Sequence, residues 1–184
     1  MPEELPHDAG PDGAAPAEAG TADEQLSLGS ERAALESFLD AQREGLVRKV
    51  AGVIDADARR APTASALTLL GLLKHATVWE RRWFQVVLLG RPSGEPWPDV
   101  RGGHEATFAV DEQDTVAHWV AAYREACEAS RVAAAGVGLD ERCVRTDLLD
   151  ANLRYVLFHL VEETARHAGH ADIIRETIDG SVGF

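Results

Sequence analysis

One stretch near the C-terminal end of the chain combines a carboxylate and imidazoles at helical spacing. Glu163 and His167 are four residues apart, and His170 follows three residues later. At about 100° per residue, both imidazoles lie within about 40° of Glu163 on a helical wheel, on the side that carries Val156 and Ile174. Because an unpaired carboxylate is unfavourable in an apolar interior, Glu163 requires a cation or strong hydrogen-bond donors.

A divalent metal ion would satisfy these side chains. Two residues at positions i and i+4 of a helix can both reach one ion. His75 lies near the middle of another predicted helix, on the face that carries Leu72, and could supply the third ligand. His75, Glu163 and His167 would then form a ligand set typical of catalytic zinc, which leaves a fourth position for water or substrate. Nickel, iron and manganese also accept imidazole and carboxylate, so zinc is the first of several candidates.

Each of these residues also has a purely structural interpretation. A histidine in a core is commonly a hydrogen-bonded structural residue, and this applies to His75. Glu163 and His167 could form an internal ion pair without any metal. His159 and His170 cannot easily both be ligands as well, so we expect them to orient ligands, to line a cavity or simply to pack.

Three residues on the predicted helix that carries His75 could contribute to a site. Arg82 could hold an anionic group of a substrate or cofactor, or pair with an acidic residue in a structural role. Trp79 and Trp83 could form the wall of a cavity, although packing in the core is the commoner role of tryptophan at such positions. In a catalytic site, His170 or His159 could transfer a proton.

Long helices are needed to hold these residues, and helix signals dominate the sequence. We expect helices over residues 31–53, 66–89, 115–135 and 151–179. Polar residues that can cap them, and glycines that can end them, stand at their boundaries: Ser30, Ser65, Asp114, Asp150, Gly90, Gly136 and Gly180. The connections over 91–109 and 137–149 are long, and residues 142–146 could be briefly extended. Four long helices with two long connections predict an all-α four-helix bundle.

Helical spacing also predicts which apolar residues face the core. Phe38 belongs to the apolar stripe of the first predicted helix, and Val132 belongs to that of the third. In the long loop that follows the second helix, Trp97 and Phe108 are expected to tether the loop to the helices.

Residues 1–29 differ in composition from the rest of the chain. They include four prolines and seven acidic residues but no aromatic residue, lysine or arginine. Such a segment cannot bury enough apolar surface to offset its ordering entropy, so we expect a disordered acidic tail followed by one domain over residues 30–184. The tail has neither the basic nor the apolar region of a signal peptide, which favours a cytoplasmic protein with two reduced cysteines, Cys127 and Cys143.

The charge balance argues against two classes of partner. The chain has a formal net charge of −13, and removing the tail's −7 leaves −6 for the domain. Sites for nucleic acid need lysine and arginine, and anionic membrane surfaces attract basic segments, so we expect neither partner. No apolar run reaches the roughly 18 residues of a membrane-spanning helix.

The residues around the candidate ligands resemble a known family. Residues 73–84, with the sequence LKHATVWERRWF, resemble the second helix of DinB-like proteins, and residues 159–172, HLVEETARHAGHAD, resemble the fourth. The similarity is greatest to an uncharacterised actinobacterial branch, covers residues 26–180 and excludes the tail. It implies a DinB-like four-helix bundle that binds a divalent metal, and a homodimer.

This resemblance also implies which residues hold the metal. Most DinB-like proteins use three histidines, one from the second helix and two at i and i+4 of the fourth. Glu163 stands at the first of those two positions, which is similar to the His, Glu, His zinc site of mycothiol-dependent maleylpyruvate isomerase. By that similarity His75, Glu163 and His167 are the ligands. The isomerase has an additional C-terminal domain that this chain lacks, so only the metal site is expected to correspond.

The resemblance favours one function and leaves two alternatives. DinB-like proteins include metal-dependent transferases for low-molecular-weight thiols such as mycothiol and bacillithiol. We therefore expect a zinc-dependent S-transferase that uses a thiol such as mycothiol and acts on a small electrophilic molecule. The alternatives are a non-catalytic protein that binds a small molecule or metal for self-protection, and a metal-assisted hydrolase that needs no thiol.

Overall fold

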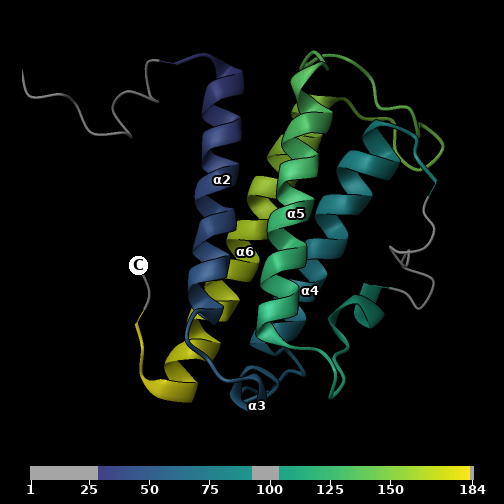
Figure 1. Cartoon of the computed structure of the whole chain (residues 1–184). Coiled ribbons are helices and arrows are strands. Elements are labelled where there is room, and N and C mark those ends of the chain that lie inside the picture. Colours follow the sequence, from purple (N-terminus) through teal and green to yellow (C-terminus); the bar gives the residue numbers. More distant parts are fainter. Residues whose placement is uncertain (1–28, 93–103, 183–184) are drawn as a thin grey trace, which may run out of the picture.

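The computed structural model describes residues 29–92 and 104–182 of the chain (Figure 1). The described residues form the following helical elements: α2 (Glu31–Val50), α3 (Asp55–Ala58), α4 (Leu69–Glu80), the π-helical segment η1 (Arg81–Leu88), the 3-10 helix η2 (His104–Phe108), α5 (Val116–Ala135) and α6 (Leu153–Asp179). The described residues contain no strand, although Arg142, in the segment predicted to be extended, forms an isolated β-bridge with Asn152. The predicted all-α fold is confirmed, whereas the predicted tail and Trp97 lie outside the described residues.

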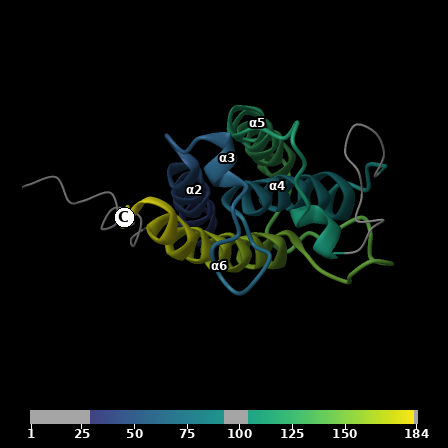
Figure 2. The same cartoon turned by 90° about the horizontal axis from the view of Figure 1, so that it is seen from below.

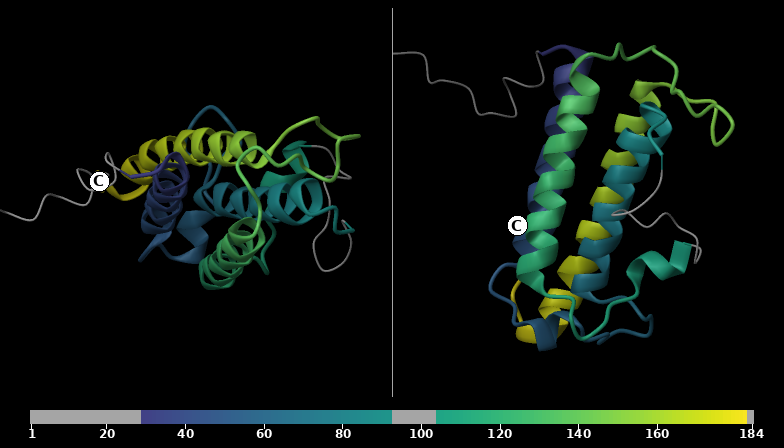
Figure 3. Two further views of the ribbon diagram at one scale, coloured as in Figure 1. Left: turned by 90° about the horizontal axis from the view of Figure 1, so that it is seen from above. Right: turned by 45° about the vertical axis from the view of Figure 1, so that its right-hand side comes forward.

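The long helices lie side by side and place α4 next to α6. Two contacts show that α2 and α6 are parallel. Glu31 accepts hydrogen bonds from Arg154 in the first turns of both helices, and Lys49 in the last turn of α2 pairs with Asp172 in the C-terminal half of α6. In the view from below, α4 lies between α5 and α6 (Figure 2). The two views of Figure 3 show the same neighbours from above and from the side. The candidate ligands on α4 and α6 are therefore carried by adjacent helices.

Apolar side chains fill the space between the helices in two groups. The group at the α5–α6 connection includes Leu39, Phe84, Leu157 and Leu160, among others. The group at the opposite end includes Leu46, Leu69, Leu72, Tyr123 and Ile174. Burial of such side chains contributes about 1.5–3 kcal/mol each, so both ends of the helices are firmly held.

Three of the four predicted helix caps are wrong, by one to three residues. Ser30 caps α2 as predicted, because its hydroxyl accepts from the Ala33 N–H. The caps of α4, α5 and α6 are instead Thr68, Thr115 and Asn152. The Asp114 carboxylate is engaged elsewhere, because it accepts hydrogen bonds from Lys74 and from the Trp119 indole. Tertiary contacts thus compete for polar side chains that the local sequence offers as caps.

Two apolar residues predicted to face the core are exposed. Phe38 is 61% exposed and Val132 is 71% exposed. Phe38 precedes the buried Leu39, and about 100° of rotation separates neighbouring residues on a helix. The helix α2 also ends at Val50 rather than at residue 53, because Gly52 adopts a φ of 75° that turns the chain towards α3.

The helix predicted over residues 66–89 changes from α-helical to π-helical winding partway along its length. Residues 69–80 are α-helical, and residues 81–88 form a π-helix with wider turns. The Leu89 N–H therefore bonds to the carbonyl of Phe84, five residues earlier. Because a π-helix turns less per residue, α-helical spacing does not give the directions of the Arg82 and Trp83 side chains. Trp83 instead lies beside His159 of α6, with ring centroids 4.4 Å apart.

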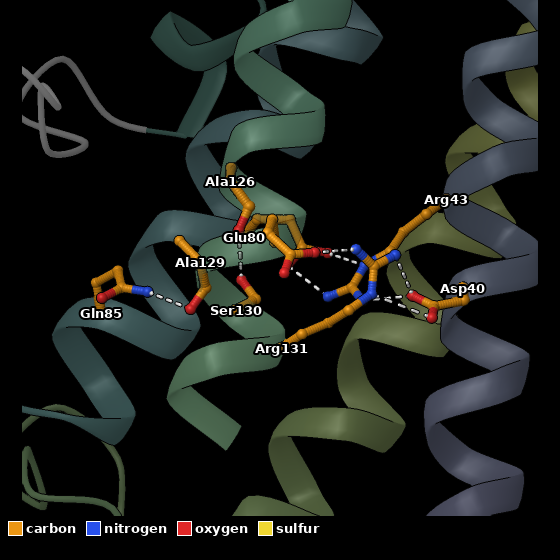
Figure 4. Close-up of polar contacts among 9 residues, drawn as sticks. Asp40, Arg43, Glu80, Gln85, Ala126, Ala129, Ser130 and Arg131 are labelled. Carbon is orange, nitrogen blue, oxygen red and sulfur yellow. Dashed lines mark hydrogen bonds and ion pairs between the residues drawn. The ribbon is translucent and has the colours of Figure 1, made fainter. Parts of the chain in front are cut away.

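A buried ion pair marks the point where the winding changes (Figure 4). Both carboxylate oxygens of Glu80, the last residue of α4, accept hydrogen bonds of 2.7 Å from the Arg43 guanidinium of α2. Arg43 also donates to Asp40, which accepts from Arg131 of α5. Since Arg43 and Glu80 are both buried, the bidentate geometry compensates for the loss of solvation of each charge. Helical spacing in the sequence did not predict this network.

Candidate metal centre

The three residues predicted to bind a metal lie together between α4 and α6. One nitrogen of His75, one of His167 and one carboxylate oxygen of Glu163 lie within 4.8 Å of one another. Within this set, Nε2 of His167 is 3.4 Å from Oε2 of Glu163. The two histidines are buried, and the Glu163 side chain is 15% exposed. We call this set the candidate metal centre.

Imidazole nitrogens at the candidate metal centre are buried without a hydrogen-bond partner. Among the described residues, this holds for Nε2 of His75 and for both ring nitrogens of His167. A buried polar atom without a partner typically destabilises a fold by about 1–3 kcal/mol. Nitrogen lone pairs beside a carboxylate are what a divalent cation requires, so these residues fit a metal ion.

Burial keeps both imidazoles neutral. Burial, with a smaller contribution from neighbouring histidines and, for His167, from Arg166, lowers the pKa of His75 to about 3 and that of His167 to about 4. At neutral pH each ring therefore keeps a free lone pair, which metal binding needs. A charged ion pair between His167 and Glu163, the structural alternative considered above, is unfavourable for the same reason. Glu163 has a different cation nearby, since its Oε1 lies 3.5 Å from Arg166.

The helix η2 covers His75 from the side of the long loop. The Phe108 ring stacks on the His75 ring, with centroids 4.0 Å apart and planes 8° from parallel. The Thr107 hydroxyl lies 2.6 Å from Nδ1 of His75. The His104 ring meets the His75 ring edge-on at 5.0 Å. Phe108 thus tethers the loop as predicted, whereas sequence reasoning missed Thr107 and His104, which stand in a segment without helical periodicity.

Close approach of η2 to α4 depends on a glycine one turn before His75. A Cβ at Gly71 would lie 2.5 Å from the carbonyl oxygen of Phe108 and 2.9 Å from the Thr68 hydroxyl. Real Cβ atoms do not approach a backbone carbonyl so closely, so only glycine permits this contact. Gly71 therefore lets η2 bring its side chains onto His75.

The remaining predicted site residues lie at different distances from the candidate metal centre. The Trp79 ring is 4.5 Å from the His75 ring, and the His170 ring is 5.8 Å from the His167 ring. A nitrogen of His159 lies within 4.8 Å of carboxylate oxygens of Glu162 and Glu163. His159 also stacks on Tyr155, with planes 5° apart.

Two of the predicted site residues, Trp83 and Arg82, are less directly connected to the candidate metal centre. Trp83 packs against His159, whose nitrogen lies within 4.8 Å of a carboxylate oxygen of Glu163. Arg82 is half-buried on η1, and no hydrogen bond or ion pair joins it to His75, Glu163 or His167. The structure therefore brings together the three candidate ligands, Trp79, His159 and His170. An anion-holding role of Arg82 is a prediction that the geometry leaves without direct support.

Comparisons with known proteins identify the family to which this chain belongs. No helix among the described residues combines the length and the apolar character needed to cross a membrane. The comparison with curated proteins finds no match. Residues 34–180 match the family model of mycothiol-S-transferase. Since this match spans most of the 184 residues and includes every candidate ligand, the chain belongs to the mycothiol S-transferase family, a member of the DinB-like superfamily.

Proposed function

We propose that this chain is a metal-dependent S-transferase that joins a low-molecular-weight thiol of the mycothiol type to a small electrophilic molecule. The observation that carries this proposal is the convergence of His75, Glu163 and His167 within 4.8 Å, in a chain of the mycothiol S-transferase family. Neutral imidazoles and a carboxylate aimed at one point suit an enzyme that activates a bound thiol.

The donor set favours zinc among the divalent metals. Two imidazoles and one carboxylate are typical of catalytic zinc and leave a position open, although nickel, iron and manganese accept the same donors. When bound, zinc would lower the pKa of a thiol and so raise the fraction of reactive thiolate at neutral pH.

The reacting thiol must come from a second molecule, because the chain's own thiols are poor nucleophiles. Cys127 and Cys143 are both free and buried. Burial raises the pKa of Cys127 to about 12 and also raises that of Cys143. Neither residue belongs to the candidate metal centre. This arrangement supports an external thiol cosubstrate such as mycothiol.

In the proposed transfer, residues of the chain receive a proton and shape the site. The thiol loses its proton, a sulfur lone pair forms a bond to an electrophilic carbon, and the electron pair of the bond that breaks at this carbon leaves with the leaving group. His159 or His170 could accept the thiol proton, since each lies beside the candidate metal centre. Trp79 and Trp83 could hold the apolar part of the electrophile, and Arg82 an anionic part.

Metal analysis and a thiol-transfer assay test this proposal together. The protein is loaded with zinc, dialysed, and assayed for thiol consumption with mycothiol and an aryl chloride electrophile. We expect one zinc per chain and a rate that falls about 100-fold or more in Glu163→Ala, because the variant loses a metal ligand. Glu176→Ala is the matched control, since Glu176 is an exposed glutamate of the same helix and belongs to neither group of possible metal ligands.

Three outcomes would contradict the proposal in different ways. Absence of bound metal in the unmodified protein would reject the candidate metal centre. Bound metal without thiol consumption for any electrophile would favour a protein that sequesters a metal or a small molecule. Metal-dependent loss of the electrophile at the same rate with and without thiol would favour a hydrolase.

A further inference from the structure

We propose that Thr107 is a positioning residue whose hydroxyl holds the His75 proton on Nδ1 and so leaves Nε2 as the atom that binds metal. This inference rests on the proposed function for its consequence, metal affinity. The position of the proton itself is a property of the metal-free protein and can be tested without any metal.

Two short hydrogen bonds of Thr107 determine where the proton lies. The Thr107 hydroxyl is 2.6 Å from the carbonyl oxygen of His104 and 2.6 Å from Nδ1 of His75. A carbonyl oxygen can only accept, so the single hydroxyl proton points to His104. The hydroxyl oxygen can then only accept from His75, and Nδ1 must carry the ring proton. In a neutral imidazole this leaves the lone pair on Nε2.

The other ring nitrogen of His75 is left free by the described residues, as this assignment requires. Nε2 of His75 is buried and has no hydrogen-bond partner among the described residues. It belongs to the ring that lies 4.8 Å from the His167 ring, and both rings contribute to the candidate metal centre. A hydrogen bond to the second ring nitrogen is the usual way in which proteins fix the tautomer of a metal-binding histidine.

The fold holds Thr107 in place through the surrounding residues of η2. Thr107 is buried, and its partner carbonyl belongs to the first residue of the same short helix. The next residue, Phe108, stacks on the His75 ring, and its carbonyl approaches α4 where Gly71 leaves room. The ring plane of His75 is therefore fixed by stacking, and its proton by the Thr107 hydroxyl.

The ring nitrogens of His75 give the first test, in metal-free protein. Protein labelled with nitrogen-15 is compared with Thr107→Ser and Thr107→Val, and the His75 signals are assigned with a His75→Asn variant. We expect wild type and Thr107→Ser to show a protonated Nδ1 and a bare Nε2. Thr107→Val, which is nearly isosteric but has no hydroxyl, should show a mixture of both neutral tautomers. An unchanged His75 tautomer in a folded Thr107→Val protein would overturn the proposal.

Zinc affinity gives the second test, by competition with a chelator. We expect Thr107→Val to bind zinc about 10- to 100-fold more weakly than wild type, and Thr107→Ser to stay within about threefold. A purely structural role would lower the affinity of both variants in proportion to their loss of thermal stability. Equal affinity of wild type and Thr107→Val would overturn the proposal. A wild-type protein that binds no zinc would instead reject the proposed function, while the ring nitrogens would still decide the role of Thr107.

Discussion

The ring nitrogens of His167 show that residues of a candidate site can lower the stability of the folded protein. Both are buried, and neither has a hydrogen-bond partner among the described residues. Oε2 of Glu163 lies 3.4 Å from Nε2, which is too far for a good hydrogen bond. A residue that served only packing would be more stable as an apolar side chain. The cost is understandable if an ion supplies the missing partner, as in active sites that sacrifice stability for function.

Replacing His167 with leucine should therefore stabilise the metal-free protein and abolish metal binding. The volume is nearly kept, and two partnerless nitrogens are removed. We expect the free energy of unfolding of the metal-free protein to rise by about 1 kcal/mol. Urea denaturation in the presence of a chelator measures this change, and elemental analysis measures the metal. A metal-free variant that is less stable than wild type would mean that these nitrogens have partners, contrary to the expectation.

At the scale of single elements, the sequence predicts the inward face of a helix better than it predicts the segments that pack against that helix. The apolar periodicity of α6 correctly places His167, which is buried, and Glu163, which is 15% exposed, on an inward face. The direction of a side chain on a regular helix follows from the spacing within that helix alone. The helix η2 was missed because five residues carry no periodicity. Its position depends on stacking against His75 and on the space at Gly71. The π-helical winding of η1 was also missed, since no local pattern distinguishes it from an α-helix.

A matched pair of glycine substitutions tests the docking of η2 on α4. Gly71→Ala places a Cβ 2.5 Å from the Phe108 carbonyl, whereas a Cβ at Gly169 of α6 meets nothing within 4 Å. Alanine favours a helix over glycine, so Gly169→Ala should raise the free energy of unfolding by about 0.5–1 kcal/mol. Gly71→Ala should lower it by about 1–3 kcal/mol, because η2 must shift. Thermal and urea denaturation compare them, and a Gly71→Ala protein as stable as Gly169→Ala would refute close docking.

The ion pair between Arg43 of α2 and Glu80 of α4 gives a second prediction at the scale of elements. Glu80→Leu leaves the buried Arg43 without its main partner, so we expect a loss of about 3–5 kcal/mol in the free energy of unfolding. Adding Arg43→Met should recover most of this loss, because the unpaired charge disappears. A double-mutant cycle in urea measures the coupling. Arg142→Ala is the control: it breaks an exposed pair with Asp150 and should have no measurable effect. Equal stability of Glu80→Leu and wild type would contradict the prediction.

At the scale of the whole molecule, the sequence predicts which helices carry the candidate site better than it predicts which residues enclose the site. Two inward faces and a suitable set of residue types were enough to predict that His75, Glu163 and His167 converge. The groups that complete the surroundings, such as Thr107 and Phe108, come from η2 in the long connection. Contacts such as that of Thr107 with His75 arise only after the chain has folded, so local spacing cannot reveal them.

The buried histidines should make the stability of the metal-free protein depend on pH. Burial holds the pKa of His75 at about 3 and that of His167 at about 4, whereas both are near 6.5 in the unfolded chain. Between these values the unfolded chain binds more protons than the folded protein. Each fall in pH below about 6.5 therefore favours unfolding, and above it the full stability is present.

This dependence can be assigned to one residue by comparing wild type with His167→Leu between pH 7.5 and pH 5. The variant should lose less stability on acidification, by about 2 kcal/mol over the range, because one proton-binding site of the unfolded chain is gone. His159, whose pKa burial also lowers, remains in both proteins and contributes equally. Carboxylates with a lowered pKa, such as Asp40, lose their contribution mainly below this range. Urea denaturation with a chelator at each pH measures the two curves, and parallel curves would show that His167 is not held neutral by burial.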